Sequence, residues 1–132
     1  MKRFTKEINI RYFDIDMNNH VNNSVYFTYM ENARTELLMD DFLAAKKDGL
    51  TFVVSETSCK YYKPIRLGDS IICEMVFTLK RKVQFLVTYT FKDKTTQEIF
   101  AEGDTMVVMI NESKNRPVAV PQAFINSYVN VD

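Results

Sequence analysis

The spacing of apolar residues changes after Gly49 in this chain of 132 residues, and that change constrains the fold more than any other feature. From Ser24 to about Lys47 apolar residues recur every three or four positions, which is the period of a helix with one buried face. Gly49 follows the lysines of the last turn, as expected just beyond a helix. We therefore expect one helix of about 24 residues, roughly 36 Å long. Its apolar positions are Tyr26, Phe27, Met30, Ala33, Leu37, Leu38 and Leu43.

Beyond Gly49 apolar residues alternate with polar ones, which is the pattern of strands that have one face in a core. Residues 71–79 and 83–91 both alternate in this way, and the basic residues 80–82 between them predict an antiparallel hairpin. Residues 51–62 and 99–111 predict two further strands, and the second contains a stretch that is apolar on both faces. An alternating segment from Phe4 to Tyr12 predicts a first strand, and the tail beyond Pro121 has room for one short helix.

These elements predict an α+β fold in which an antiparallel sheet of about five strands covers one long helix. The length suits one domain, which we assign to residues 1–132. One helix covers only one face of a sheet. We therefore expect a second copy of the chain to cover part of the remaining surface, in a homodimer or homotetramer.

The charge balance restricts the classes of partner. Lys and Arg number 17, as do Asp and Glu, so no excess positive charge attracts nucleic acid or an anionic membrane. No apolar run approaches the roughly 20 residues that cross a bilayer, and the first ten residues do not resemble a signal peptide. Cys59 and Cys73 form no CxxC pair, which favours free thiols over a disulfide. We therefore expect a cytoplasmic protein without a nucleic-acid or membrane partner.

A polar loop before the helix contains the residues best suited to chemistry. Alternate positions of this loop carry Asp14, Asp16, Asn18, His20 and Asn22. The first N–H groups of a helix have no partner within it, and together with the helix dipole they stabilise an oxyanion. A carboxylate such as that of Asp16 beside them could attack an acyl carbon or deprotonate a water. The loop therefore predicts acyl-transfer chemistry.

Other interpretations of this loop are open. Its start imitates a calcium-binding loop, but Asn19 and Val25 stand where such a loop requires Gly and Glu. A zinc site is disfavoured because His20 is the only histidine in the chain. The Asp and Asn residues could instead be turn formers and helix caps, and Cys59 with His20 could form a weak nucleophilic pair.

Several segments spread over nearly the whole chain carry a family resemblance. They are residues 12–16 (YFDID), 18, 20–23 (HVNN), 26, 31–34 (ENAR), 61–69 (YYKPIRLGD) and 101–103 (AEG). In this combination they resemble the hotdog-fold acyl-CoA thioesterases, the family that includes 4-hydroxybenzoyl-CoA thioesterases and acyl-carrier-protein thioesterases. The resemblance implies the hotdog fold, a long helix wrapped by an antiparallel sheet, which agrees with the elements expected from periodicity.

This resemblance implies roles for four loop residues. Asp16 would be the catalytic carboxylate, acting as nucleophile or general base, and the backbone N–H of Asn23 would polarise the thioester carbonyl. Asn18 would position the acid or the substrate, and His20 would orient a water or hydrogen-bond the carboxylate. Related enzymes often carry an acidic residue where this chain has Lys60, which counts against a mechanism with a second carboxylate there.

Five residues are candidates for substrate binding. Tyr26 and Met30 could line an acyl pocket, although such residues on a helix face are more often part of an ordinary core. Lys60, Lys63 and Arg66 could bind the phosphates of coenzyme A or an acidic carrier protein, or they are solvated strand ends.

Together these features predict an acyl thioesterase that hydrolyses acyl-CoA or acyl-carrier-protein thioesters to a free acid and a thiol, with no cofactor and no metal. Two alternatives share the fold. One is a non-catalytic protein that binds or senses acyl thioesters, and the other is a hotdog dehydratase acting on 3-hydroxyacyl chains.

Overall fold

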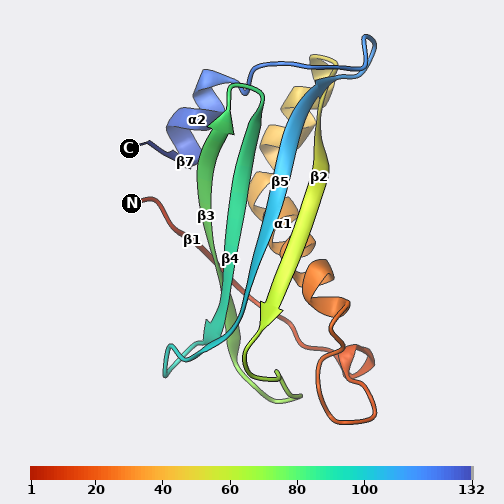
Figure 1. Ribbon diagram of the computed structural model, residues 1–132, viewed down its shortest axis with the longest axis vertical. Coiled ribbons are helices and arrows are strands. Elements are labelled where there is room, and N and C mark those ends of the chain that lie inside the picture. The colour runs from red at the N-terminus through yellow and green to blue at the C-terminus, as the bar shows by residue number, and fades with distance from the viewer. Residues whose placement is uncertain (132) are drawn as a thin grey trace.

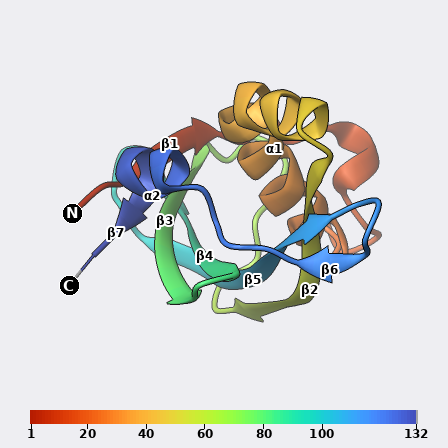
Figure 2. The ribbon, with the colours of Figure 1, turned by 90° about the horizontal axis from the view of Figure 1, so that it is seen from above.

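The computed structural model describes residues 1–131, in which a long helix lies across one face of a curved sheet (Figures 1 and 2). This arrangement confirms the expected α+β hotdog fold. In chain order the elements are β1 (Phe4–Glu7), the 3-10 helix η1 (Tyr12–Asp14), α1 (Val25–Lys47), β2 (Leu50–Tyr61), β3 (Ile71–Arg81), β4 (Gln84–Asp93), β5 (Ile99–Asn111), β6 (Arg116–Pro117), α2 (Gln122–Tyr128) and β7 (Val129–Asn130).

The sheet has seven strands, which corrects the expected number of about five. Five of them form the order β1-β3-β4-β5-β2, and the two-residue strands β6 and β7 pair with β5 and β3. The expected hairpin is present, because β3 and β4 are antiparallel neighbours. The two extra strands escaped prediction because two residues are too short to show an alternating pattern.

The first strand is also shorter than expected. It ends at Glu7, whereas the sequence pattern continues to Tyr12. Residues Tyr12–Asp14 form the 3-10 helix η1 instead, because the side chain of Asp14 accepts hydrogen bonds from the backbone and guanidinium of Arg11. A local turn therefore replaces the end of the predicted strand.

Helix α1 begins and ends close to the predicted residues. It starts at Val25, and the preceding Ser24 forms no side-chain hydrogen bond to the first turn. At the other end Gly49 has a φ of +74°, a left-handed conformation that glycine adopts without strain. None of the helices within residues 1–131 is long and apolar enough to cross a membrane.

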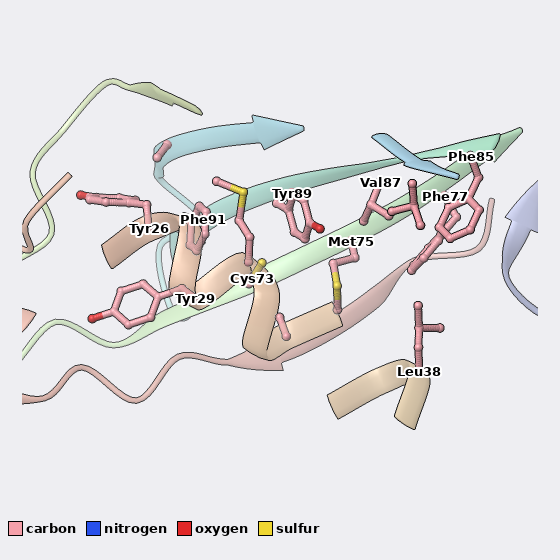
Figure 3. Packing of buried hydrophobic residues seen from close by; sticks show 14 of the residues in the cluster. Tyr26, Tyr29, Leu38, Cys73, Met75, Phe77, Phe85, Val87, Tyr89 and Phe91 are labelled. Atoms are coloured by element: carbon pink, nitrogen blue, oxygen red, sulfur yellow. The ribbon is translucent and has the colours of Figure 1, made fainter. Parts of the chain in front are cut away.

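The core lies between α1 and the face of the sheet that it covers (Figure 3). Every second residue of β3 and β4 points into this core, as the alternating pattern predicts. Cys73 is buried in this cluster and Cys59 is half-buried in β2, and both are free thiols as expected. The largest fully buried side chains include Tyr26, Met30, Met75, Phe77, Phe85, Tyr89 and Phe91.

A substitution at Phe85 tests how much this core contributes to the stability of the protein. Its ring is fully buried, with centroid distances of 4.9 Å to Phe124 and 5.8 Å to Phe77. Phe85→Ala should lower the free energy of unfolding by about 3–5 kcal/mol, because it leaves a cavity. Urea unfolding at a fixed protein concentration measures this loss. Val131→Ala is the control, since Val131 is 76% exposed, and should change stability by less than about 0.5 kcal/mol. Equal effects of the two variants would contradict this account of the core.

Candidate functional site

The loop between η1 and α1 is a closed turn. The N–H of Asp16 donates to the carbonyl oxygen of His20 at 2.8 Å, and a β-bridge joins Ile15 to Val21. Asn19 sits at the bend with a φ of +60°, a conformation that asparagine tolerates better than most residues. The polar sequence of this loop therefore folds into an ordered turn at the start of the helix.

The carboxylate of Asp16 is held by this turn. Its Oδ1 atom accepts the backbone N–H of Asn18 at 2.9 Å and that of His20 at 3.2 Å. The side chain is exposed, and its Oδ2 atom has no hydrogen-bond partner within residues 1–131. One carboxylate oxygen is thus used to orient the group, and the other is free to interact with a water or a ligand.

A cavity of about 240 Å³ opens beside this carboxylate. Five of the nine predicted site residues line it: Asp16, His20, Asn23, Tyr26 and Lys63. The sequence did not single out the other four lining residues as site residues, namely Val21, Tyr61, Tyr62 and Pro64. The loop before α1 and the segment that follows β2 therefore share one site. The backbone bond from the N–H of Val21 to the carbonyl oxygen of Ile65, at 2.8 Å, joins these two segments.

The start of α1 faces the same cavity. The hydroxyl of Tyr61 donates to the carbonyl oxygen of Asn23 at 2.9 Å, and Ser24 N–H donates to the side chain of Asn22 at 3.0 Å. Among residues 1–131 the N–H of Asn23 has no such acceptor. This free N–H lies at the positive end of the helix dipole, where it can donate to an anionic or polarised oxygen.

Burial raises the pKa of Tyr61 to about 12. The phenol therefore stays protonated at neutral pH and remains a hydrogen-bond donor. Its ring also packs edge-on against Tyr26, with centroids 4.8 Å apart. Tyr61 thus braces the start of the helix from the opposite wall of the cavity.

Four predicted site residues do not line this cavity. Asn18 contributes its backbone N–H to Asp16, but its side chain lies outside the lining. Met30 is 1% exposed in the core. Its side chain packs against Gly103, where an added Cβ atom would lie only 2.5 Å from the Cε atom of Met30. Lys60 lines a different depression on the sheet, beside Tyr62. The fourth, Arg66, belongs to the exposed turn after β2, where its N–H donates to the side chain of Asp69 at 2.8 Å.

Lys63 is the one predicted cation that borders the cavity. Its ammonium group lies 2.7 Å from a carboxylate oxygen of Glu98 and 4.9 Å from the ring centroid of Phe100. Both groups of the ion pair are about half exposed, so the pair is weak and another anion can replace Glu98 as the partner of Lys63.

Sequence reasoning gave no role to Asp14, the first acid of the loop. Its carboxylate is 2% exposed and accepts the hydroxyl of Tyr29 at 2.6 Å. Burial by itself would raise the pKa of Asp14, but hydrogen bonds from Tyr29 and Arg11 outweigh it and hold the pKa below its usual range. Asp14 is therefore an ionised, buried anchor. The only sequence signal for it was its place in the Asp-x-Asp pair.

Comparison with known proteins supports the thioesterase resemblance over most of the chain. The family model described as "Thioesterase-like superfamily" matches residues 10–127. The chain is 25% identical over 128 residues to the acyl-CoA thioester hydrolase YbgC of Escherichia coli, covering 95% of each chain. It is 24% identical over 127 residues to the chloroplastic acyl-acyl carrier protein thioesterase ATL3 of Arabidopsis thaliana, covering 94% of this chain and 66% of that protein.

A solved structure with the same fold is a 1,4-dihydroxy-2-naphthoyl-CoA thioesterase from Synechocystis. The TM-score is 0.84 with 17% sequence identity, and the match covers 93% of each chain. At this level of identity the likeness concerns the fold.

The thiol of Cys59 lies on β2, two residues before the cavity residue Tyr61, and should not act as a nucleophile. Burial raises its pKa to about 11, so very little thiolate is present at neutral pH. We expect Cys59 to react with a disulfide reagent at pH 7.5 at least about tenfold more slowly than free cysteine, whose pKa is about 8.5, because its smaller thiolate fraction outweighs the higher nucleophilicity of its thiolate. Stopped-flow labelling of Cys73→Ser, which leaves one thiol, measures this rate. Labelling as fast as that of free cysteine would restore the Cys59–His20 pair as a candidate.

Proposed function

Because this chain belongs to the thioesterase-like superfamily, whose family model matches residues 10–127, we propose that it hydrolyses acyl thioesters of coenzyme A or acyl carrier protein. The observation that carries this proposal is one cavity lined by both Asp16, whose Oδ2 atom has no partner within residues 1–131, and Asn23, whose N–H has none there either. The relatives named as an acyl-CoA thioester hydrolase and an acyl-carrier-protein thioesterase support both substrate classes.

The two groups supply complementary parts of the reaction. The N–H of Asn23, at the positive end of α1, donates to the thioester carbonyl oxygen and stabilises the negative charge that develops there. The free Oδ2 of Asp16 acts on the carbonyl carbon, directly or through a water. Tyr61 keeps the start of the helix in place through its bond to Asn23.

In the general-base route, Asp16 takes a proton from water and the resulting hydroxide bonds to the carbonyl carbon. The carbon–sulfur bond then breaks, and the thiolate leaves with the proton that Asp16 returns. In the nucleophilic route, a carboxylate oxygen bonds to the carbon first, the thiolate leaves, and water hydrolyses the mixed anhydride. Both routes require ionised Asp16 and give a free acid and a thiol.

The remaining predicted residues take supporting roles in this proposal. His20 lines the cavity beside Asp16, where its ring orients the water or hydrogen-bonds the carboxylate. Asn18 holds the carboxylate through its backbone N–H. Tyr26 forms a wall of the cavity, whereas Met30 supports that wall from within the core. Lys63, with Lys60 and Arg66 on the surface nearby, attracts the phosphates of the substrate.

We also propose that two copies of the chain complete the site, in a homodimer or a pair of dimers. Strand β2 is at the edge of the sheet, and within residues 1–131 no strand pairs with its outer side. Its side chains from Val53 to Ser58 are all exposed, so the edge is open to another strand. Next to the site the loop also exposes Tyr12, Phe13 and Met17. A second copy would cover this apolar surface and deepen a cavity that is too small for an acyl-CoA.

Asp16→Asn tests the proposed reaction. The amide keeps the shape of the side chain but neither accepts a proton nor attacks, so kcat should fall by about 10²–10⁴-fold while the protein stays folded. Release of thiol from a panel of acyl-CoA and aryl-CoA thioesters measures the activity, and circular dichroism checks the fold. Asp48→Asn, at the far end of α1, is the matched control and should leave kcat unchanged.

Three outcomes, from this panel, from acyl-CoA binding and from an enoyl-thioester hydration assay, would contradict the proposal. Full activity of Asp16→Asn would remove Asp16 from the mechanism. Tight binding of acyl-CoA by the unaltered protein without thiol release would favour the binding or sensor alternative. Hydration of an enoyl thioester would favour the dehydratase.

Val54→Lys tests the shared site. Val54 is 43% exposed on the open edge of β2, and a charge there should oppose pairing with a second copy. Light scattering should give the mass of two or four chains of 15.5 kDa for the unaltered protein, and of one chain for the variant, with loss of most activity. Ile99→Lys is the control, because Ile99 is 45% exposed but lies on β5. A monomeric, fully active unaltered protein would refute the shared site.

A further inference from the structure

The two acids of the loop have opposite environments. Asp16 is exposed beside the cavity, whereas Asp14 is 2% exposed. A buried carboxylate costs free energy unless hydrogen bonds replace its hydration. Asp14 accepts the hydroxyl of Tyr29 at 2.6 Å, the N–H of Arg11 at 2.9 Å, and the guanidinium of Arg11 at 3.0 and 3.3 Å. Donors from Arg11, just before η1, and from Tyr29 on α1 therefore converge on one side chain.

The backbone of Asp14 closes the loop that carries the proposed catalytic acid. Its carbonyl oxygen accepts the N–H of Asn22 at 2.9 Å, and the bridge between Ile15 and Val21 lies directly inside this bond. Asp16 follows within the closed loop. A shift of Asp14 would therefore move Asp16 and the end of the loop together.

Tyr29 connects this loop to the helix. Its ring packs in the core beside Tyr26, with centroids 6.4 Å apart, and both rings lie at one end of the buried cluster (Figure 3). Its hydroxyl is bonded to the carboxylate of Asp14. Neither Tyr29 nor Asp14 lines the site cavity, so neither contacts what binds there.

We propose that Asp14 is a positioning residue, held by Tyr29 and Arg11, that fixes the carboxylate of Asp16 relative to the N–H of Asn23. This role rests on the proposed thioester hydrolysis, in which both groups must reach one carbonyl. Asp16 belongs to the loop that Asp14 closes, and Asn23 immediately precedes the helix that carries Tyr29. The bond between Tyr29 and Asp14 therefore sets their separation. A displacement of about 1 Å between reacting groups can lower a rate by about a hundredfold.

Tyr29→Phe tests this role by removing only the hydroxyl. We expect kcat for the best thioester substrate to fall about 10- to 100-fold with KM within about twofold, because the cavity wall is unchanged. Asp14→Asn should lower kcat at least as much. The double variant Asp14→Asn with Tyr29→Phe should be no worse than Asp14→Asn alone, since both substitutions act through one hydrogen bond.

Tyr128→Phe is a matched control. The hydroxyl of Tyr128 donates to Asp41 at 2.5 Å, so the same kind of bond is lost toward the other end of α1. We expect its kcat to stay within about twofold of the unaltered enzyme. An equal loss of kcat in Tyr128→Phe and Tyr29→Phe would reveal a general effect of helix stability and would overturn the positioning role.

Hydrogen exchange separates this proposal from the proposed function, because it needs no turnover. The amides of Asp16 and Asn22 should exchange faster in Tyr29→Phe than in Tyr128→Phe, since their bonds lie inside the loop that Asp14 closes. Faster exchange with unchanged kcat would overturn the positioning role while leaving hydrolysis intact. An unaltered protein that hydrolyses no member of the thioester panel would overturn the proposed function, and the positioning role with it.

Discussion

Covering the apolar face of one helix with one sheet is the constraint on which the rest of this structure depends. A flat sheet touches a cylinder along one line, so the sheet must curve to bury more of the helix, as it does around α1 (Figure 2). Irregular register accompanies this curvature in three antiparallel pairs, and such irregularities bend strands and increase their twist. They lie at Val54/Glu56, Leu79/Arg81 and Phe91/Lys92.

The packing of the sheet around one helix also explains why the candidate site lies at the N-terminal end of α1. At its N-terminal end α1 is bounded by loops as well as strands, because the segments before α1 and after β2 meet there (Figure 1). The N–H of Ile65 donates to the hydroxyl of Tyr26 at 3.3 Å, and the hydroxyl of Tyr61 donates to Asn23. These bonds hold the helix start without occupying the N–H of Asn23. The N–H of this cavity-lining residue thus has no acceptor within residues 1–131.

The sequence predicts best what depends on local spacing. One helical period, two alternating runs and two further apolar runs were enough for α1 and the strands β2 to β5, because periodicity is a property of neighbouring residues. The attachment of Asp14 to α1 depends instead on its partner Tyr29, which lies 15 residues away. The contact from Tyr61 to Asn23 spans 38 residues. Such contacts leave no local pattern, so the predicted site contained the loop residues and lacked the residues that brace them.

The spacing of the two acids explains how one loop can be both anchored and available for chemistry. In an extended strand Asp14 and Asp16 would share a face, but η1 ends at Asp14 and the bridge residue Ile15 lies between them. One acid can therefore be buried while the other is exposed. Burying both charges would require a second set of donors, and exposing both would leave the loop without its bond to α1. The buried acid uses its oxygens for Tyr29 and Arg11, whereas Asp16 uses one oxygen for the turn and leaves the other without a partner within residues 1–131.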